Sequence, residues 1–386
     1  MFTRPTPLPS DIKVAPTSYP LKINGSGQCL SLIIGDLLTV FHLGSLTQRF
    51  QRSFGRVPVL AEVLEKTNIV ALVFSSDPTN IHIWDDQQAK IIQTINSQNP
   101  IVNLHFRENF LFVITETTSL LYRIQDFSLV TKTITGQNPL GLGQLWVSSA
   151  HDYRLVVPGP EPGSALSVGS ALSVGHVLII QSESQFDFQA HQNPLSAMTL
   201  SSDGRVLATA SQRGTIVRLW AINPSLPRIS GAKYSNPKVI EETFSQKAQL
   251  IQEFRRGAEA TTIHSMVFHP DPEQHVLALT GKTKTTHLFT WVNEKVESND
   301  SNRIIKAKNP DRGWLNQAWS AVSREIPNYI TSQGSLIQIA SQKNCLAIFH
   351  PEQPELILIS PDTKLSKYLY RLDPPETRQI LMLQLI

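Results

Sequence analysis

Short apolar or alternating runs recur along the whole chain, with turn-forming residues between them. Such runs are typical of β-strands, whose successive side chains point to opposite faces of a sheet. The predicted strands are residues 29–34, 37–43, 69–74, 81–84, 101–106, 110–115, 120–124, 177–181, 197–200, 206–210, 216–220, 265–268, 276–280, 287–291, 336–339, 345–349 and 356–359. The pattern therefore predicts an all-β protein.

Several of these strands follow a common local order: a turn, then Thr or Asn, then a strand with an aromatic end, as in residues 79–85, 213–220 and 284–289. Residues 201–210 are similar to a propeller hairpin with an Asp-Gly turn. Trp84-Asp85 keeps the signature dipeptide of WD40 repeats. With a repeat of roughly 40–50 residues, the chain predicts a single seven-bladed β-propeller over residues 1–386, built from degenerate WD40-like repeats with long inserted loops.

Two segments interrupt the strand pattern. Residues 157–175 contain three prolines and then a tandem Gly-Ser-Ala-Leu-Ser-Val duplication, which marks a low-complexity surface loop tolerant of length change. Residues 293–327 form the second predicted loop. The proline-rich start of the chain lacks the apolar core of a signal peptide, and residues 29–43 are too short to span a bilayer. We therefore expect any membrane contact to be peripheral.

Composition narrows the function classes. Charged residues make up 17% of the chain and the net charge is +3, which is too weak to indicate a nucleic-acid partner. The two cysteines, Cys29 and Cys345, support neither a disulfide framework nor a zinc site and fit a reducing compartment. None of the common catalytic motifs is present. We expect no enzyme activity, no cofactor and no metal.

The most informative local feature is Phe254-Arg255-Arg256-Gly257. On a strand, consecutive side chains point to opposite faces, so the two guanidinium groups would serve two separate anion sites. Arginine suits bidentate phosphate binding. An isolated Arg-Arg pair is more often a solvated strand end, so the flanking sequence decides between the two interpretations.

Reading outward from this tetrapeptide, the chain resembles the PROPPIN family, whose animal members are called WIPI proteins. The resemblance is strongest over residues 191–289, which include His191-Gln192-Asn193-Pro194, Ser211-Gln212-Arg213-Gly214-Thr215 and Thr285-Thr286-His287. It implies a seven-bladed propeller that binds phosphoinositides at two rim sites.

The resemblance also implies which residues bind lipid. The first site would contain His191, Ser211, Thr215, Arg218 and Arg255. The second would contain Arg256, Thr285, His287, Lys282 and Lys284. The second site departs from the family, because Gly281, Lys284 and Ala260 stand where serine, glycine and a basic residue are common. Each serine, threonine and histidine taken alone would more often be structural.

A basic segment, residues 302–325, carries Trp314, Leu315, Ala318, Trp319 and Val322 at helical spacing. Two tryptophans on a basic amphipathic segment are typical of a membrane interface. The alternative is a helix packed on the side of the propeller. The family resemblance favours membrane insertion through Trp314, Leu315, Trp319 and Val322.

Together these features predict a non-catalytic phosphoinositide effector. By resemblance it would bind phosphatidylinositol 3-phosphate and phosphatidylinositol 3,5-bisphosphate on autophagic or endosomal membranes. It would be cytoplasmic, monomeric in solution and recruited peripherally to preautophagosomal, endosomal or vacuolar and lysosomal membranes. Expected partners are autophagy proteins, including a lipid-transfer protein, with the Pro78 region of the second blade as a candidate surface. The alternative is a propeller scaffold that binds only proteins.

Overall fold

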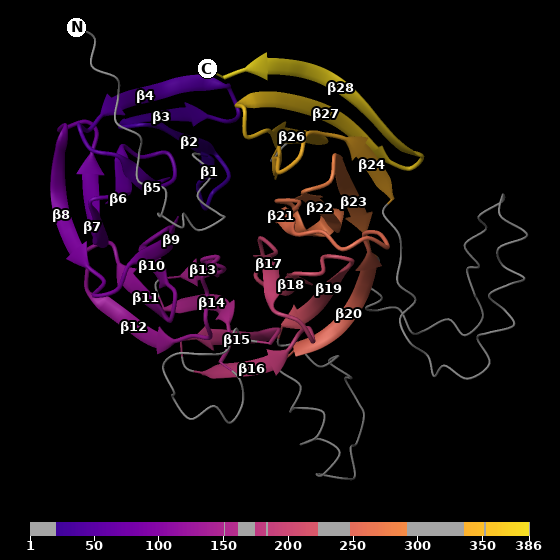
Figure 1. Ribbon diagram of the computed structural model, residues 1–386, viewed down its shortest axis with the longest axis horizontal. Helices are drawn as coiled ribbons and strands as arrows, with labels where there is room; N and C mark the ends of the chain where they lie inside the picture. Colours follow the sequence, from indigo (N-terminus) through magenta and orange to yellow (C-terminus); the bar gives the residue numbers. More distant parts are fainter. Residues whose placement is uncertain are drawn as a thin grey trace, which may run out of the picture.

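The computed structural model describes residues 21–149, 151–160, 174–182, 184–222, 248–291, 336–350 and 353–385. These residues form seven four-stranded antiparallel sheets, each made of four strands consecutive in sequence. The sheets stand around a common centre, with the first strand of each blade innermost and the fourth at the periphery (Figure 1). The predicted seven-bladed β-propeller is confirmed.

The strands follow one another blade by blade. The first blade contains β1 (Leu21–Ile23), β2 (Cys29–Ile34), β3 (Leu37–His42) and β4 (Thr47–Ser53). The second contains β5 (Pro58–Val63), β6 (Ile69–Phe74), β7 (Asp77–Asp85) and β8 (Lys90–Asn96). The third contains β9 (Ile101–Arg107), β10 (Phe110–Thr115), β11 (Thr118–Arg123) and β12 (Leu129–Ile134). The fourth contains β13 (Gln144–Ser149), β14 (Asp152–Pro158), β15 (His176–Gln181) and β16 (Gln185–Gln189).

The fifth and sixth blades carry most of the residues of the predicted lipid sites, and the seventh blade completes the ring. The fifth contains β17 (Leu195–Leu200), β18 (Val206–Ser211), β19 (Ile216–Ile222) and β20 (Ala248–Arg255). The sixth contains β21 (Ile263–Phe268), the short helix η1 (Pro272–Gln274), β22 (Val276–Gly281), β23 (Thr285–Thr290) and β24 (Ile337–Ala340). The seventh contains β25 (Leu346–Phe349), β26 (Glu355–Ile359), β27 (Lys364–Leu372) and β28 (Pro375–Gln384).

The apolar core is divided among the gaps between blades. Each pair of neighbouring blades among the described residues encloses its own cluster of buried side chains. The cluster that joins the last blade to the first includes Leu30, Leu32, Ile359 and Leu365, each at most 1% exposed. Among the described residues, the first and last blades share no strand, so packing in this cluster closes the ring there (Figure 1).

Every predicted strand run coincides with a strand, apart from shifts of a few residues at the ends. The pattern missed five strands inside the blades, β1, β5, β13, β14 and β27. It also missed most of the peripheral strands, such as β4, β8, β12 and β16. Their side chains are largely exposed, so the alternation of apolar and polar residues that marks a half-buried strand is weak. The first two residues of the predicted loop 157–175 belong to β14, and residues 161–173 lie outside the described residues.

The predicted loop 293–327 lies wholly outside the described residues. Within the ranges that the structure does describe, no helix is long and apolar enough to cross a membrane.

The packing that closes the ring can be tested with two leucines that are cross-strand neighbours on β27 and β28. Leu365 is fully buried, whereas its cross-strand partner Leu383 is 39% exposed. We expect Leu365→Ala to lower the free energy of unfolding by about 2–5 kcal/mol, because it leaves a cavity in the closing cluster. The matched Leu383→Ala should cost less than about 1 kcal/mol. Chemical denaturation measures both, and equal losses would contradict closure by this cluster.

Candidate functional site

The two adjacent arginines lie at the end of β20, on the periphery of the fifth blade. Phe254 is fully buried between the fifth and sixth blades, where its ring stacks on Phe289 at a centroid distance of 4.7 Å. Arg255 is exposed, whereas Arg256 is 8% exposed. Because side chains alternate along β20, burial of Phe254 directs Arg255 towards the side of the fourth blade and Arg256 towards the sixth.

Arg218 lies on the same face of the fifth blade as Arg255. It stands opposite Glu253 on β20, and its Nε donates to Glu253 Oε1 at 2.6 Å. Its Nη1 donates to the carbonyl oxygen of Ala190 at 2.7 Å, which ties the segment before β17 to β19. Arg218 is therefore already paired. Its two bonds fix β19, β20 and the segment before β17 relative to one another.

His191 follows directly after Ala190 and is 5% exposed. Its Nε2 lies 3.0 Å from Thr209 Oγ1. Burial lowers the pKa of His191 to about 4, and the nearby positive charge of Arg218 acts in the same direction. The imidazole is therefore neutral at pH 7, when it can donate one hydrogen bond but adds no charge.

Ser211 and Thr215 stand at the two ends of the tight turn between β18 and β19. Ser211 is buried and Thr215 is half-buried. No hydrogen bond or ion pair of the Arg255 side chain is formed within the described ranges, so its guanidinium is open to an external anion. Ser211, Arg218 and Arg255 therefore share one strand face of the fifth blade with Thr209, the residue that His191 contacts, while Thr215 lies in the turn at the edge of this face. Within the described ranges, Arg255 is the cation of this group that has no partner.

The second predicted site lies where the fifth blade meets the sixth. Burial lowers the pKa of Arg256, against the opposite effect of the Glu259 carboxylate. His287 on β23 is 5% exposed, and burial together with the charge of Arg256 lowers its pKa to about 4. Its Nδ1 is buried and has no hydrogen-bond partner among the described residues. Such an atom costs free energy unless a ligand or water satisfies it.

The other residues predicted for the second site are less closely grouped. Thr285 is half-buried and Lys284 is exposed, both where β23 begins. Lys282 instead lines the central cavity of the propeller. Gly281 occupies the position where serine is common in the family, and a Cβ there would lie 2.9 Å from the carbonyl oxygen of Thr262. A serine at position 281 would therefore require the Thr262 carbonyl group to move.

The four residues predicted to enter the membrane, Trp314, Leu315, Trp319 and Val322, lie outside the described residues.

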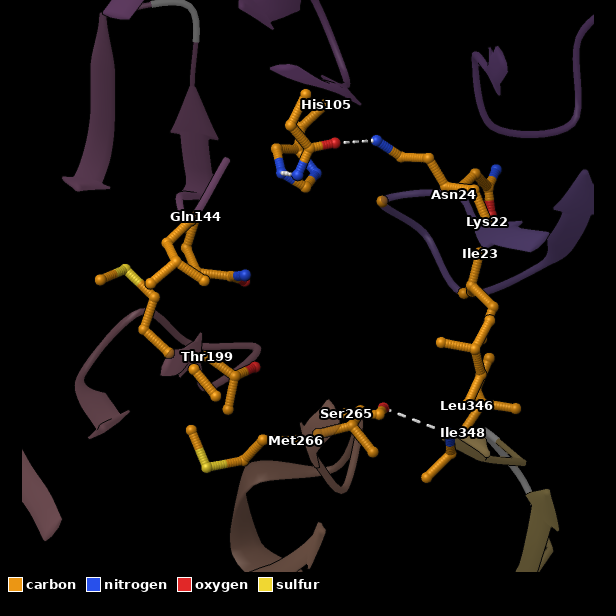
Figure 2. A pocket seen from close by; sticks show the side chains of 18 of the residues that line it. Lys22, Ile23, Asn24, His105, Gln144, Thr199, Ser265, Met266, Leu346 and Ile348 are labelled. Carbon is orange, nitrogen blue, oxygen red and sulfur yellow. Dashed lines mark hydrogen bonds between the residues drawn. The ribbon is translucent and has the colours of Figure 1, made fainter. Parts of the chain in front are cut away.

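The central cavity, of about 1080 Å³, is a second place where a ligand could bind. Figure 2 shows Lys22, Asn24 and His105 on one side of it. Lys22 Nζ lies 2.9 Å from the buried Glu62 carboxylate and donates to the carbonyl of Leu104. Glu62 Oε1 also accepts a hydrogen bond from the backbone N–H of Phe106 at 2.9 Å. These contacts join the first three blades through the buried Glu62 carboxylate.

Sequence reasoning missed two residues that shape the candidate sites. Glu253 pairs with Arg218, and Gly214 contributes a carbonyl oxygen that accepts a hydrogen bond from Arg256 Nε at 2.6 Å. The position of Glu253, two residues before Arg255, was a usable signal, because residues two apart on a strand share a face. Nothing in the sequence indicates that the carbonyl oxygen of Gly214 would accept a hydrogen bond from Arg256. The described ranges contain no cluster of three side chains suited to hold a metal ion.

Comparison with known proteins identifies similar chains. A family model described as PROPPIN matches residues 27–384. The chain is 25% identical to Autophagy-related protein 18 of Dictyostelium discoideum over 319 residues, covering 80% of this chain and 75% of that one. It is 23% identical to WD repeat domain phosphoinositide-interacting protein 1 of Xenopus laevis over 338 residues, covering 84% and 68%.

Solved structures show the same fold. Kluyveromyces lactis Hsv2 superposes with a TM-score of 0.67 at 16% identity, covering 95% of this chain and 98% of that one. The complex of KlAtg21 with the coiled coil of AgAtg16 contains a chain with a TM-score of 0.66 at 16% identity, covering 94% and 98%.

The buried histidines predict a pH dependence of stability. His191 has a pKa of about 4 when folded, against 6.5 ordinarily. As the pH falls from 6.5 towards 4, the unfolded chain binds a proton that the folded chain does not, so stability is lost. We expect His191→Gln to flatten the fall in unfolding free energy over this range by on the order of a few kcal/mol.

Urea denaturation between pH 7.5 and 4 measures this slope. His151→Gln, at an exposed histidine in the turn between β13 and β14, is the control for the substitution itself. An identical slope in the wild type and the His191→Gln variant would contradict a neutral, buried His191.

Proposed function

The chain belongs to the PROPPIN family, whose members are non-catalytic β-propellers, and from this premise we propose that it binds phosphoinositide headgroups on membranes of the autophagy pathway. The observation that carries the proposal is the division of the arginine pair between two faces of one peripheral strand, with a buried histidine beside each face. The candidate lipids are phosphatidylinositol 3-phosphate and phosphatidylinositol 3,5-bisphosphate.

In the first site, Arg255 would supply the bidentate charge pairing that a phosphate prefers. Ser211 and Thr215 would add short hydroxyl donors, and neutral His191 would add one N–H. The charge of Arg218 is balanced by Glu253 at 2.6 Å. Arg255 therefore contributes most of the attraction for an anion at this site.

In the second site, the unpartnered Nδ1 of His287 and the adjacent Arg256 support an anion between the fifth and sixth blades. Thr285 and the exposed Lys284 lie at the start of the same strand, β23. Lysine is a flexible point charge and selects geometry less sharply than arginine. We propose that the second site binds phosphate with lower selectivity than the first.

Membrane attachment would come from the segment between β23 and β24. Residues 292–335 connect these strands, and they include Trp314 and Trp319. The segment leaves the far end of β23, which is only about 20 Å from the second site because a six-residue strand rises roughly 3.4 Å per residue. One edge of the sixth blade could therefore present both headgroup contacts and inserted tryptophans to a bilayer. Several weak contacts on one rigid body reinforce one another.

The names of similar proteins support a role in autophagy. The Xenopus relative is called phosphoinositide-interacting, and the Dictyostelium relative is called autophagy-related. The chain of the KlAtg21 complex binds a coiled coil. We propose that the protein is recruited peripherally to preautophagosomal, endosomal or lysosomal membranes and there binds autophagy proteins, with a coiled coil or a lipid-transfer protein as candidate partners.

The proposal predicts that Arg255→Thr reduces binding to vesicles containing phosphatidylinositol 3-phosphate by about tenfold or more, because one charge-assisted phosphate contact is lost. Vesicle flotation measures the bound fraction. The matched control is Arg378→Thr, at an exposed arginine on peripheral strand β28 of the seventh blade. If both variants float like the wild type, the headgroup site is wrongly placed. If the wild type ignores vesicles bearing either lipid, the protein is a scaffold for proteins only.

The membrane segment makes a separate prediction. We expect Trp314→Asp combined with Trp319→Asp to weaken vesicle binding while leaving the affinity for the soluble headgroup unchanged, because charged side chains resist insertion into the interface. Flotation and titration calorimetry give the two affinities. Unchanged vesicle binding would instead favour the alternative, a helix packed on the side of the propeller.

A further inference from the structure

The side chain of Arg256 is enclosed by backbone carbonyl groups. Its Nε donates to the carbonyl oxygen of Gly214 at 2.6 Å, and its Nη2 donates to the carbonyl oxygen of Glu259. Its backbone N–H donates to the carbonyl oxygen of Thr215 at 2.9 Å. Two of these three bonds reach the turn between β18 and β19. The two side-chain bonds occupy N–H donors of the guanidinium that are then not available to a phosphate.

That turn leaves little freedom to the chain. Gly214 has a φ of +56°, and a Cβ at this position would lie 1.8 Å from the carbonyl oxygen of Thr261. The backbone N–H of Thr261 in turn donates to the carbonyl oxygen of Arg213 at 3.0 Å. Residues 256–261 therefore clamp the turn from outside, and Arg256 supplies the side-chain part of this clamp.

The clamped turn carries ligands of the other site. Ser211 ends β18 and Thr215 precedes β19, so the turn sets the distance and orientation between the two hydroxyl groups assigned to the first site. We propose that Arg256 is the positioning residue of the first lipid site, in addition to its contact with anions in the second. This inference rests on the proposed lipid-binding function.

The two arginines therefore have different roles in the two sites. Arg255 has no hydrogen bond or ion pair within the described ranges, so its loss should affect only the first site. Arg256 holds the turn of the first site and faces the second. Loss of Arg256 should therefore damage both sites.

Two substitutions of similar shape separate these roles. In Arg256→Gln, the amide nitrogen occupies the position along the side chain that Nε occupies in arginine, and it can still donate to the Gly214 carbonyl. Arg256→Met has similar length but no donor. Both variants remove the charge from the second site, so the headgroup binding that remains reports the first site.

Titration calorimetry with inositol 1,3-bisphosphate, the soluble headgroup of phosphatidylinositol 3-phosphate, measures this binding. We expect the Gln variant to retain one binding site with roughly tenfold higher affinity than the Met variant, since a hydrogen bond to a buried carbonyl is lost only in the latter. Equal affinities would overturn the positioning role. Absence of any binding by the wild-type protein would instead overturn the proposed function.

Folding is checked by near-ultraviolet circular dichroism. If Arg256→Met does not fold, the Gln variant decides the question with Arg255→Thr added to it. Binding by Arg256→Gln that disappears in the double variant assigns the remaining binding to the first site, as the proposal requires. Loss of all binding in a folded Arg256→Gln would overturn it, because the donor to Gly214 alone would then not preserve the first site.

Discussion

The burial of Phe254 between the fifth and sixth blades is the constraint on which both candidate sites depend. Its ring has no exposed surface and stacks on Phe289. Since side chains alternate along a strand, this contact decides which face each neighbouring arginine takes, and a slip of one residue would exchange them. Arg255 therefore opens to solvent beside Arg218 and His191, while Arg256 turns inward towards His287.

The rigid ring holds the two candidate sites at a fixed spacing. Seven clusters of buried side chains, one between each pair of neighbouring blades, hold the described part of the propeller together. The two sites are built on adjacent blades that share the cluster around Phe254. Headgroup contacts spaced by a rigid scaffold can act together on a membrane, whereas the same contacts on a mobile chain would pay more conformational entropy for each lipid bound.

The sequence predicted the ring, many of the strands and the separation of the two arginines, because each follows from the alternation of side chains or from a repeated motif. It did not predict the innermost strands β1, β5 and β13. Peripheral strands such as β4 were not predicted either, because both of their faces are partly exposed to solvent. Sequence reasoning also missed the pairing of Glu253 with Arg218 and the clamp on Gly214. Those contacts join strands or turns through specific atoms, and only three-dimensional packing brings the atoms together.

The central claim is that lipid headgroups bind at the edges of the fifth and sixth blades. Hydrogen–deuterium exchange tests it most directly, with vesicles that contain phosphatidylinositol 3-phosphate compared with vesicles that contain phosphatidylinositol. We expect slower exchange of the backbone amides in residues 211–215 and 281–287 only with the phosphorylated lipid. Unchanged exchange in both segments, with protection confined to other blades, would contradict it.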